Sequence, residues 1–164
     1  MNNIKVLVVD DSSLFRQMII QHLSSQQGIE IVGYAINAYD AKRKIPLLNP
    51  TVLTLDVEMP GLSGIDFLKQ LLPTNPIPVV LVSSLNLNVF DALSAGAVDF
   101  VRKPDMSVSN SKDTFFSSLT QKVRAASISK VRLPRQIGNT ANTVPAGATL
   151  SSNIISRQAA APVQ

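Results

Sequence analysis

The sequence predicts an α/β fold in which a parallel sheet of five strands carries helices on both faces. Runs of β-branched and aliphatic residues alternate five times with segments of helical periodicity. These runs are predominantly apolar, as expected for strands that are buried on both faces of a parallel sheet. Several of them stop abruptly at an acid or a hydroxyl, and open α/β sheets bind their ligands at that edge.

The predicted strands are short, and most of their residues are Val, Leu or Ile. They are Lys5–Val9, Ile29–Ala35, Val52–Asp56, Pro78–Val82 and Ala97–Val101. Turn residues rich in Pro, Gly, Asn and Ser separate them from the following segments, as expected for strand boundaries.

A helix is predicted after each strand. The first is capped by Ser12 or Ser13 and closed by Gly28; its buried face is expected to comprise Leu14, Met18, Ile19 and Leu23. The others are Asp40–Leu48, Ile65–Leu72, Asn88–Ala95 and one that opens at Ser111 or Asp113. Pro46 lies inside the second helix, which is therefore expected to be short or kinked.

The composition favours a cytoplasmic protein with one folded domain. The chain has 164 residues and no cysteine, and it contains neither a signal peptide nor an apolar stretch long enough to cross a bilayer. Residues 1–127 are predicted to form the domain, and residues 128–164, rich in Ser, Asn, Thr, Ala, Pro and Gly, a flexible linker. The net charge of +4 comes from four scattered cations in the linker, which argues against nucleic-acid binding.

Polar residues at the ends of four predicted strands are expected to meet at one edge of the sheet. They are Asp10, Asp11, Asp56, Ser83 and Lys103. Three carboxylates in one crevice repel one another unless a cation is bound, and oxygen ligands suit Mg²⁺. One carboxylate can then act as a nucleophile toward a phosphoryl group, while the metal, the lysine and the hydroxyl stabilise the transferred charge.

Each of these residues also has a simpler interpretation. Asp10 and Asp11 could cap a helix, Ser83 could be a polar strand end, and Lys103 could be solvated, as most lysines are. Four such coincidences at one edge of one sheet are much less expected than a single site, so the combination favours the chemical interpretation.

Residues 3–127 resemble the receiver domains of two-component response regulators. The motifs are the acidic pair Asp10–Asp11, the DxxMPxxxG block from Asp56 to Gly64, Ser83, and the pair Lys103–Pro104. The resemblance implies a flavodoxin-like fold, a doubly wound parallel sheet with strand order 2-1-3-4-5. It also implies a phosphoacceptor role for Asp56.

The same resemblance assigns roles to the other residues. Asp11 and Asp56 would ligate Mg²⁺, Asp10 would help through water, and the backbone carbonyl of Glu58 would be a further ligand. Lys103 would contact the phosphoryl group and form a cis peptide with Pro104. On phosphorylation Ser83 would move inward, and the ring of Phe100 would turn into the vacated space.

A narrower resemblance is to the receiver of the chemotaxis protein-glutamate methylesterases, the CheB family. It rests on Asp56–Leu68, Pro78–Leu85 and Gly96–Pro104. In that family a linker connects the receiver to a serine hydrolase, which the unphosphorylated receiver inhibits. The implied partners are a chemotaxis histidine kinase, the hydrolase domain and, through it, methylated chemoreceptors.

The chain departs from that family in three ways, one of which is Pro46 inside the second helix. It contains no GxSxG motif and a single histidine, so the hydrolase is missing, and a truncation within the linker is expected. The segment Asn86–Ala95 is also a few residues shorter than that family would suggest. The fragment itself would catalyse only its own phosphorylation and dephosphorylation, and it is expected to be a monomer that binds neither nucleic acid nor membrane.

Three alternatives remain open at this point. A stand-alone receiver of the CheY type would be an interaction module, and a receiver fused to a DNA-binding domain would belong to a transcription factor. A flavin or nucleotide binder is disfavoured because no glycine-rich phosphate loop follows the first strand.

Overall fold

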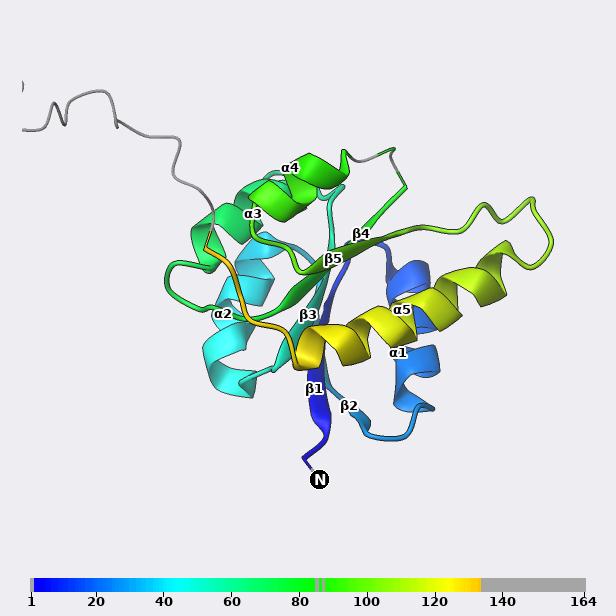
Figure 1. The fold of residues 1–164 in the computed structure, drawn as a ribbon, viewed down its shortest axis with the longest axis horizontal. Helices are drawn as coiled ribbons and strands as arrows, with labels where there is room; N and C mark the ends of the chain where they lie inside the picture. Colours follow the sequence, from blue (N-terminus) through cyan, green and yellow to red (C-terminus); the bar gives the residue numbers. More distant parts are fainter. Residues whose placement is uncertain (1, 85, 87, 134–164) are drawn as a thin grey trace, which may run out of the picture.

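The computed structural model describes residues 2–84, 86 and 88–133, and a parallel five-stranded sheet forms its centre (Figure 1). The strands are β1 (Ile4–Val9), β2 (Ile29–Ala35), β3 (Val52–Asp56), β4 (Val79–Ser83) and β5 (Asp99–Arg102). The helices are α1 (Ser13–Ser24), α2 (Ala38–Leu48), α3 (Gly64–Leu71), α4 (Val89–Ser94) and α5 (Ser111–Ser127). The strand order β2-β1-β3-β4-β5 confirms both the predicted α/β fold and the flavodoxin-like topology.

Helices cover both faces of the sheet and bury a separate aliphatic core on each (Figure 1). Successive residues of a strand point to opposite faces. Leu53 and Leu55 of β3 therefore pack with α2, α3 and α4, whereas Val52 packs with α1 and α5. Burial on both faces explains why β3 lacks the polar alternation of a half-exposed strand. Within the described ranges, no helix is long and apolar enough to span a membrane.

Helix α1 begins after Ser12, whose side-chain oxygen accepts a hydrogen bond from the Phe15 amide at 3.3 Å. Ile19 and Leu23 are buried as predicted. The prediction for Leu14 is wrong, because its side chain is 71% exposed. The inward face of this helix runs through Phe15, Ile19 and Leu23, which are four residues apart, so Leu14 lies one position away from it.

Helix α2 continues past Pro46 to Leu48 and has 11 residues, so of the expected short or kinked helix the first form is wrong and the second stays a prediction. Pro46 is exposed in the last turn of the helix, where its missing amide removes only one backbone hydrogen bond. The helix ends at Asn49, which adopts a left-handed conformation and donates its amide to the Ile45 carbonyl at 3.0 Å.

Beyond α5 the chain turns back toward the opposite face of the sheet (Figure 1). Ile128 is exposed, but Val131 packs against the core formed by α2, α3 and α4. Residues 134–164 of the predicted linker lie outside the part of the chain that the structure describes.

Candidate functional site

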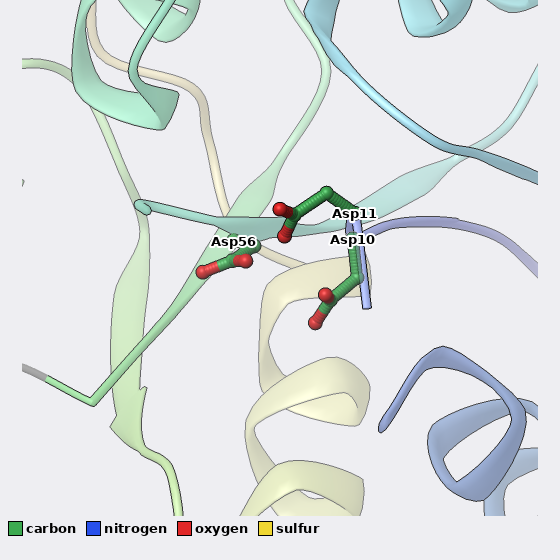
Figure 2. Close-up of side chains that lie close together, drawn as sticks. All are labelled: Asp10, Asp11 and Asp56. Carbon is green, nitrogen blue, oxygen red and sulfur yellow. The ribbon is translucent and has the colours of Figure 1, made fainter. Parts of the chain in front are cut away.

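Three carboxylates gather where β1 and β3 end side by side (Figure 2). Asp10 and Asp11 follow the last residue of β1, and Asp56 is the last residue of β3. One carboxylate oxygen from each lies within 4.8 Å of the others. Asp10 and Asp56 are each only 1% exposed, whereas Asp11 faces solvent. The sheet thus brings together the three acids that the sequence predicted to meet.

Lys103 completes the cluster from the carboxyl end of β5, which is an outer strand of the sheet. It follows β5, and its amide donates to the Ser83 carbonyl at 2.8 Å, which fixes the chain beside the end of β4. Its ammonium nitrogen lies 3.4 Å from Asp10 Oδ2 and 3.3 Å from Asp56 Oδ2. The same ammonium lies over the ring of Phe15, 4.6 Å from its centroid. One lysine therefore faces two buried carboxylates.

The cluster is electrostatically unfavourable when all its carboxylates are ionised. Burial, and after it the charge of Asp10, raises the pKa of Asp56 to about 7. Burial also raises the pKa of Asp10. Lys103 opposes both shifts but does not cancel them. Removal of carboxylate charge from water is the dominant cause in both cases.

The donor set fits a small, hard cation. Asp10 Oδ2 and Asp56 Oδ2 are buried and have no hydrogen-bond partner among the described residues. Their second oxygens are satisfied locally, since Asp10 Oδ1 accepts from the Ser12 amide at 2.9 Å and Asp56 Oδ1 from the Glu58 amide at 3.0 Å. The two Oδ2 atoms share the Lys103 ammonium, at 3.4 Å and 3.3 Å, which compensates their burial only in part. A divalent cation with oxygen preference would satisfy both.

The loop between β3 and α3 returns closely to Asp56, and this return requires a glycine. A Cβ atom on Gly64 would lie 2.3 Å from the Asp56 carbonyl oxygen and 2.8 Å from the Val57 Cα. The Gly64 amide donates to the Val57 carbonyl at 2.9 Å, which closes the loop. Met59 is buried within it. The spacing of Asp56, Met59 and Gly64 in the sequence is therefore explained by the compact loop that these residues form.

Ser83, at the end of β4, is engaged by the side chain of Glu58. The Ser83 hydroxyl donates to Glu58 Oε1 at 2.9 Å, and the Ser84 amide donates to the same oxygen at 2.9 Å. The Ser84 hydroxyl donates to Glu58 Oε2. The carboxylate of Glu58 thus joins the loop after β3 to the segment after β4.

Comparisons of the sequence and of the fold with known proteins lead to the same family. The model of the response regulator receiver domain matches residues 6–109. The chain belongs to the response regulator receiver domain family. A protein-glutamate methylesterase/protein-glutamine glutaminase of Syntrophomonas wolfei is 48% identical over 131 residues, which are 80% of this chain and 38% of that protein.

Solved receiver structures show the same fold. The response regulator domain of Thermotoga maritima CheB has 38% identity and a TM-score of 0.70, and the match covers 77% of this chain and 97% of that one. CheY in the CheX–CheY–BeF3–Mg²⁺ complex of Borrelia burgdorferi has 26% identity and a TM-score of 0.64, covering 78% of this chain and 92% of that one. The chain is thus a receiver domain of the CheB type, and it spans less than half the length of the methylesterases it matches.

One expectation for this receiver turns out differently, and another stays untested. The Lys103–Pro104 peptide bond is trans, so the predicted cis-proline at Pro104 is wrong. Trans is the more stable isomer of most X-Pro bonds, and Lys103 reaches both carboxylates from it. Phe100 is half-buried in β5 and packs against the core formed by α2, α3 and α4. Its role as a switch stays a prediction.

Sequence reasoning missed two contributions to the site of this receiver. It assigned only the backbone carbonyl of Glu58, whereas the side chain holds both serines after β4. It also missed Arg16, whose guanidinium donates to the Asp10 carbonyl at 2.8 Å from the first turn of α1. The contact of Glu58 with the serines had a signal in the sequence. Glu58 lies two residues after Asp56, and a pair of serines ends the next strand.

Proposed function

We propose that this receiver accepts a phosphoryl group on Asp56. The observation that supports the proposal is the buried carboxylate of Asp56 at the sheet edge, with Lys103 3.3 Å away and two further acids beside it. An Asp56 oxygen attacks phosphorus, and the bond from phosphorus to the donor nitrogen or oxygen breaks with its electron pair leaving on the donor. The product is an acyl phosphate, which water later hydrolyses.

Mg²⁺ is the cation that this proposal assigns to the acidic cluster. Asp10, Asp11 and Asp56 would hold it, with the backbone carbonyl of Glu58 as a further ligand. Bound there, the cation would neutralise charge on the carboxylates and on the transferred group. The buried Oδ2 atoms of Asp10 and Asp56, which share one ammonium and accept no hydrogen bond, support this assignment, as does the Mg²⁺ named with the similar CheY of Borrelia burgdorferi.

Side chains of this receiver would carry out the remaining steps. The Lys103 ammonium would contact a phosphoryl oxygen and spread its charge. The Ser83 hydroxyl would donate to another oxygen, and Phe100 would then turn into the space that Ser83 leaves. This movement would alter the surface formed by α4, β5 and α5.

The proposal extends to the longer protein to which such a receiver would belong. The phosphodonor would be a chemotaxis histidine kinase, and the controlled domain a protein-glutamate methylesterase/protein-glutamine glutaminase acting on chemoreceptors. The similarity to such enzymes over their N-terminal portion supports it. A cytoplasmic location is part of the same proposal, in line with the absence of cysteine.

Intact-mass spectrometry after incubation with acetyl phosphate and Mg²⁺ tests the central step. One added phosphoryl group is expected in the natural sequence, and none in Asp56→Asn or in the presence of excess EDTA. Asp113→Asn, which changes an exposed acid on α5, is the matched control and should label normally. Labelling of Asp56→Asn to the same extent would exclude Asp56 as the acceptor.

A further inference from the structure

The side chain of Glu58 ties the loop after β3 to the end of β4. Its backbone amide donates to Asp56 Oδ1 at 3.0 Å, so Glu58 is bound directly to the aspartate at the centre of the site. Its carboxylate accepts the Ser83 hydroxyl and the Ser84 amide, both at 2.9 Å. Glu58 is half-buried and Ser83 is 1% exposed, so these hydrogen bonds are partly shielded from water.

The Ser83 hydroxyl has only one hydrogen to donate. In this structure that hydrogen points to Glu58, whereas the proposed phosphorylated state needs it on a phosphoryl oxygen. Both acceptors are anionic, and hydrogen bonds to charged acceptors are stronger than neutral ones. The two acceptors therefore compete for one hydrogen.

The incoming group also repels the Glu58 carboxylate. An acyl phosphate on Asp56 adds negative charge two residues away from Glu58. This charge lies close to the Glu58 backbone amide, which donates a hydrogen bond to the Asp56 side chain. Repulsion pushes the Glu58 carboxylate away from the site at the same time as Ser83 acquires a better acceptor. Both effects favour release of Ser83 and Ser84 together.

We propose that the Glu58 carboxylate is a latch that holds Ser83 and the segment after β4 in the unphosphorylated arrangement, and that phosphorylation of Asp56 opens it. The inference rests on the proposed function and adds to it a positioning residue that acts through Ser83. It makes the resting state of this receiver depend on a side chain outside the acidic cluster and outside the hydrophobic core.

Removal of the latch should speed phosphorylation. In Glu58→Ala the rate of labelling by acetyl phosphate is expected to rise about tenfold, the change that corresponds to loss of one hydrogen bond to a charged group. Glu58→Gln keeps an oxygen acceptor for Ser83 and the Ser84 amide but loses the charge, so its rate should lie between those of Glu58→Ala and the natural sequence. Glu30→Ala is the matched control, since Glu30 is the only other glutamate and is exposed on β2.

A double-mutant cycle separates the latch from a simple charge effect. If Glu58 acts through Ser83, Glu58→Ala should change the labelling rate by less than about twofold in a Ser83→Ala background. An equal acceleration in both backgrounds would mean that Glu58 only repels the donor, and the latch would be wrong. An unchanged or slower rate in Glu58→Ala would also overturn it.

Hydrogen exchange gives a readout that needs no phosphate. The Ser84 amide donates to Glu58, so it should exchange faster in Glu58→Ala, while amides in the centre of β4 keep their protection. Unchanged exchange at Ser84 would contradict the latch. Absence of labelling in the natural sequence would instead contradict the proposed function, so the two failures are distinguishable.

Discussion

At the scale of single residues, the electrostatics of the site depend on the Lys103 ammonium, which two carboxylates share. The Lys103 ammonium lies 3.4 Å from Asp10 Oδ2 and 3.3 Å from Asp56 Oδ2, and both carboxylates are buried. A single positive charge cannot neutralise two negative ones, so Lys103 does not cancel the rise in the pKa of Asp56 that burial, and after it the charge of Asp10, produces. Lys103 is thus placed both to receive a phosphoryl oxygen and to compete with a metal ion for the same acids.

Replacement of Lys103 should separate these two roles. In Lys103→Met the rate of labelling by acetyl phosphate is expected to fall on the order of 100-fold, as when one charge-stabilising donor is removed from an active site. The affinity for Mg²⁺ should rise, because the competing ammonium has been removed. Calorimetric titration with Mg²⁺ and intact-mass kinetics measure the two effects.

The control for this change is Lys112→Met, which alters an exposed lysine in the first turn of α5. It should leave both quantities unchanged. Weaker Mg²⁺ binding in Lys103→Met would contradict the competition between the ammonium and the metal, whatever happens to the labelling rate.

The sequence allowed the charged residues to be predicted better than their contacts. Asp10, Asp56 and Lys103 could be placed at one edge because each lies at the end of an apolar run, and parallel strands end together. The hydrogen bond from the Ser83 hydroxyl to the Glu58 carboxylate could not be predicted, because it depends on how the loop after β3 folds back. Leu14 was misplaced because a buried helical face shifted by one residue fits the apolar pattern almost as well.

At the scale of elements, the loop between β3 and α3 sets the position of Asp56. Its two ends meet where the Gly64 amide donates to the Val57 carbonyl. Ser63 then caps α3, since its side chain accepts from the Asp66 amide at 3.2 Å. The helix therefore begins at Gly64, where the loop comes closest to the Asp56 backbone.

A methyl group at Gly64 should disturb this loop. Ala favours a helix over Gly by about 1 kcal/mol, so helix propensity alone predicts that Gly64→Ala is stabilising. The close approach to the Asp56 and Val57 backbone predicts the reverse, a loss of about 1–3 kcal/mol in the free energy of unfolding, because backbone atoms cannot move aside easily. Urea denaturation distinguishes the two, and a neutral or stabilising effect would rule out the close contact.

Element boundaries were predictable where a cap or a turn residue marks them. Ser12 and Asn88 accept amide hydrogen bonds at the starts of α1 and α4. Asn37 does the same for α2, whose start was predicted at Asp40 and lies at Ala38. Pro46 misled the prediction for α2 because the penalty for a helical proline depends on its distance from the end of the helix, which the sequence alone does not fix.

At the scale of the whole molecule, the fold places an electrostatically unfavourable site on a well-packed frame. Separate aliphatic cores on the two faces of the sheet hold β1 and β3 side by side, and the acids lie at the carboxyl ends of those two strands. The packing free energy of the frame must offset the repulsion and burial of the carboxylates. The stability of the domain should therefore depend on the charge of the site.

That dependence gives a prediction with a definite sign. The pKa of Asp56 is raised from 3.8 to about 7 on folding, so between these values the native state binds more protons than the unfolded state. Without divalent cations the free energy of unfolding should fall as pH rises from about 4 to about 7, since stability decreases with pH wherever the native state holds more protons. Asp10, whose pKa is also raised, adds to the fall.

Urea denaturation in EDTA across this pH range measures the effect. Asp56→Asn should flatten the slope, because the neutral amide does not titrate, and should be more stable than the natural sequence above about pH 7. Added Mg²⁺ should stabilise the natural sequence more at high pH than at low pH, since it binds the ionised carboxylates. A free energy of unfolding that rises with pH in EDTA would show that Lys103 and the local hydrogen bonds outweigh the burial of these acids.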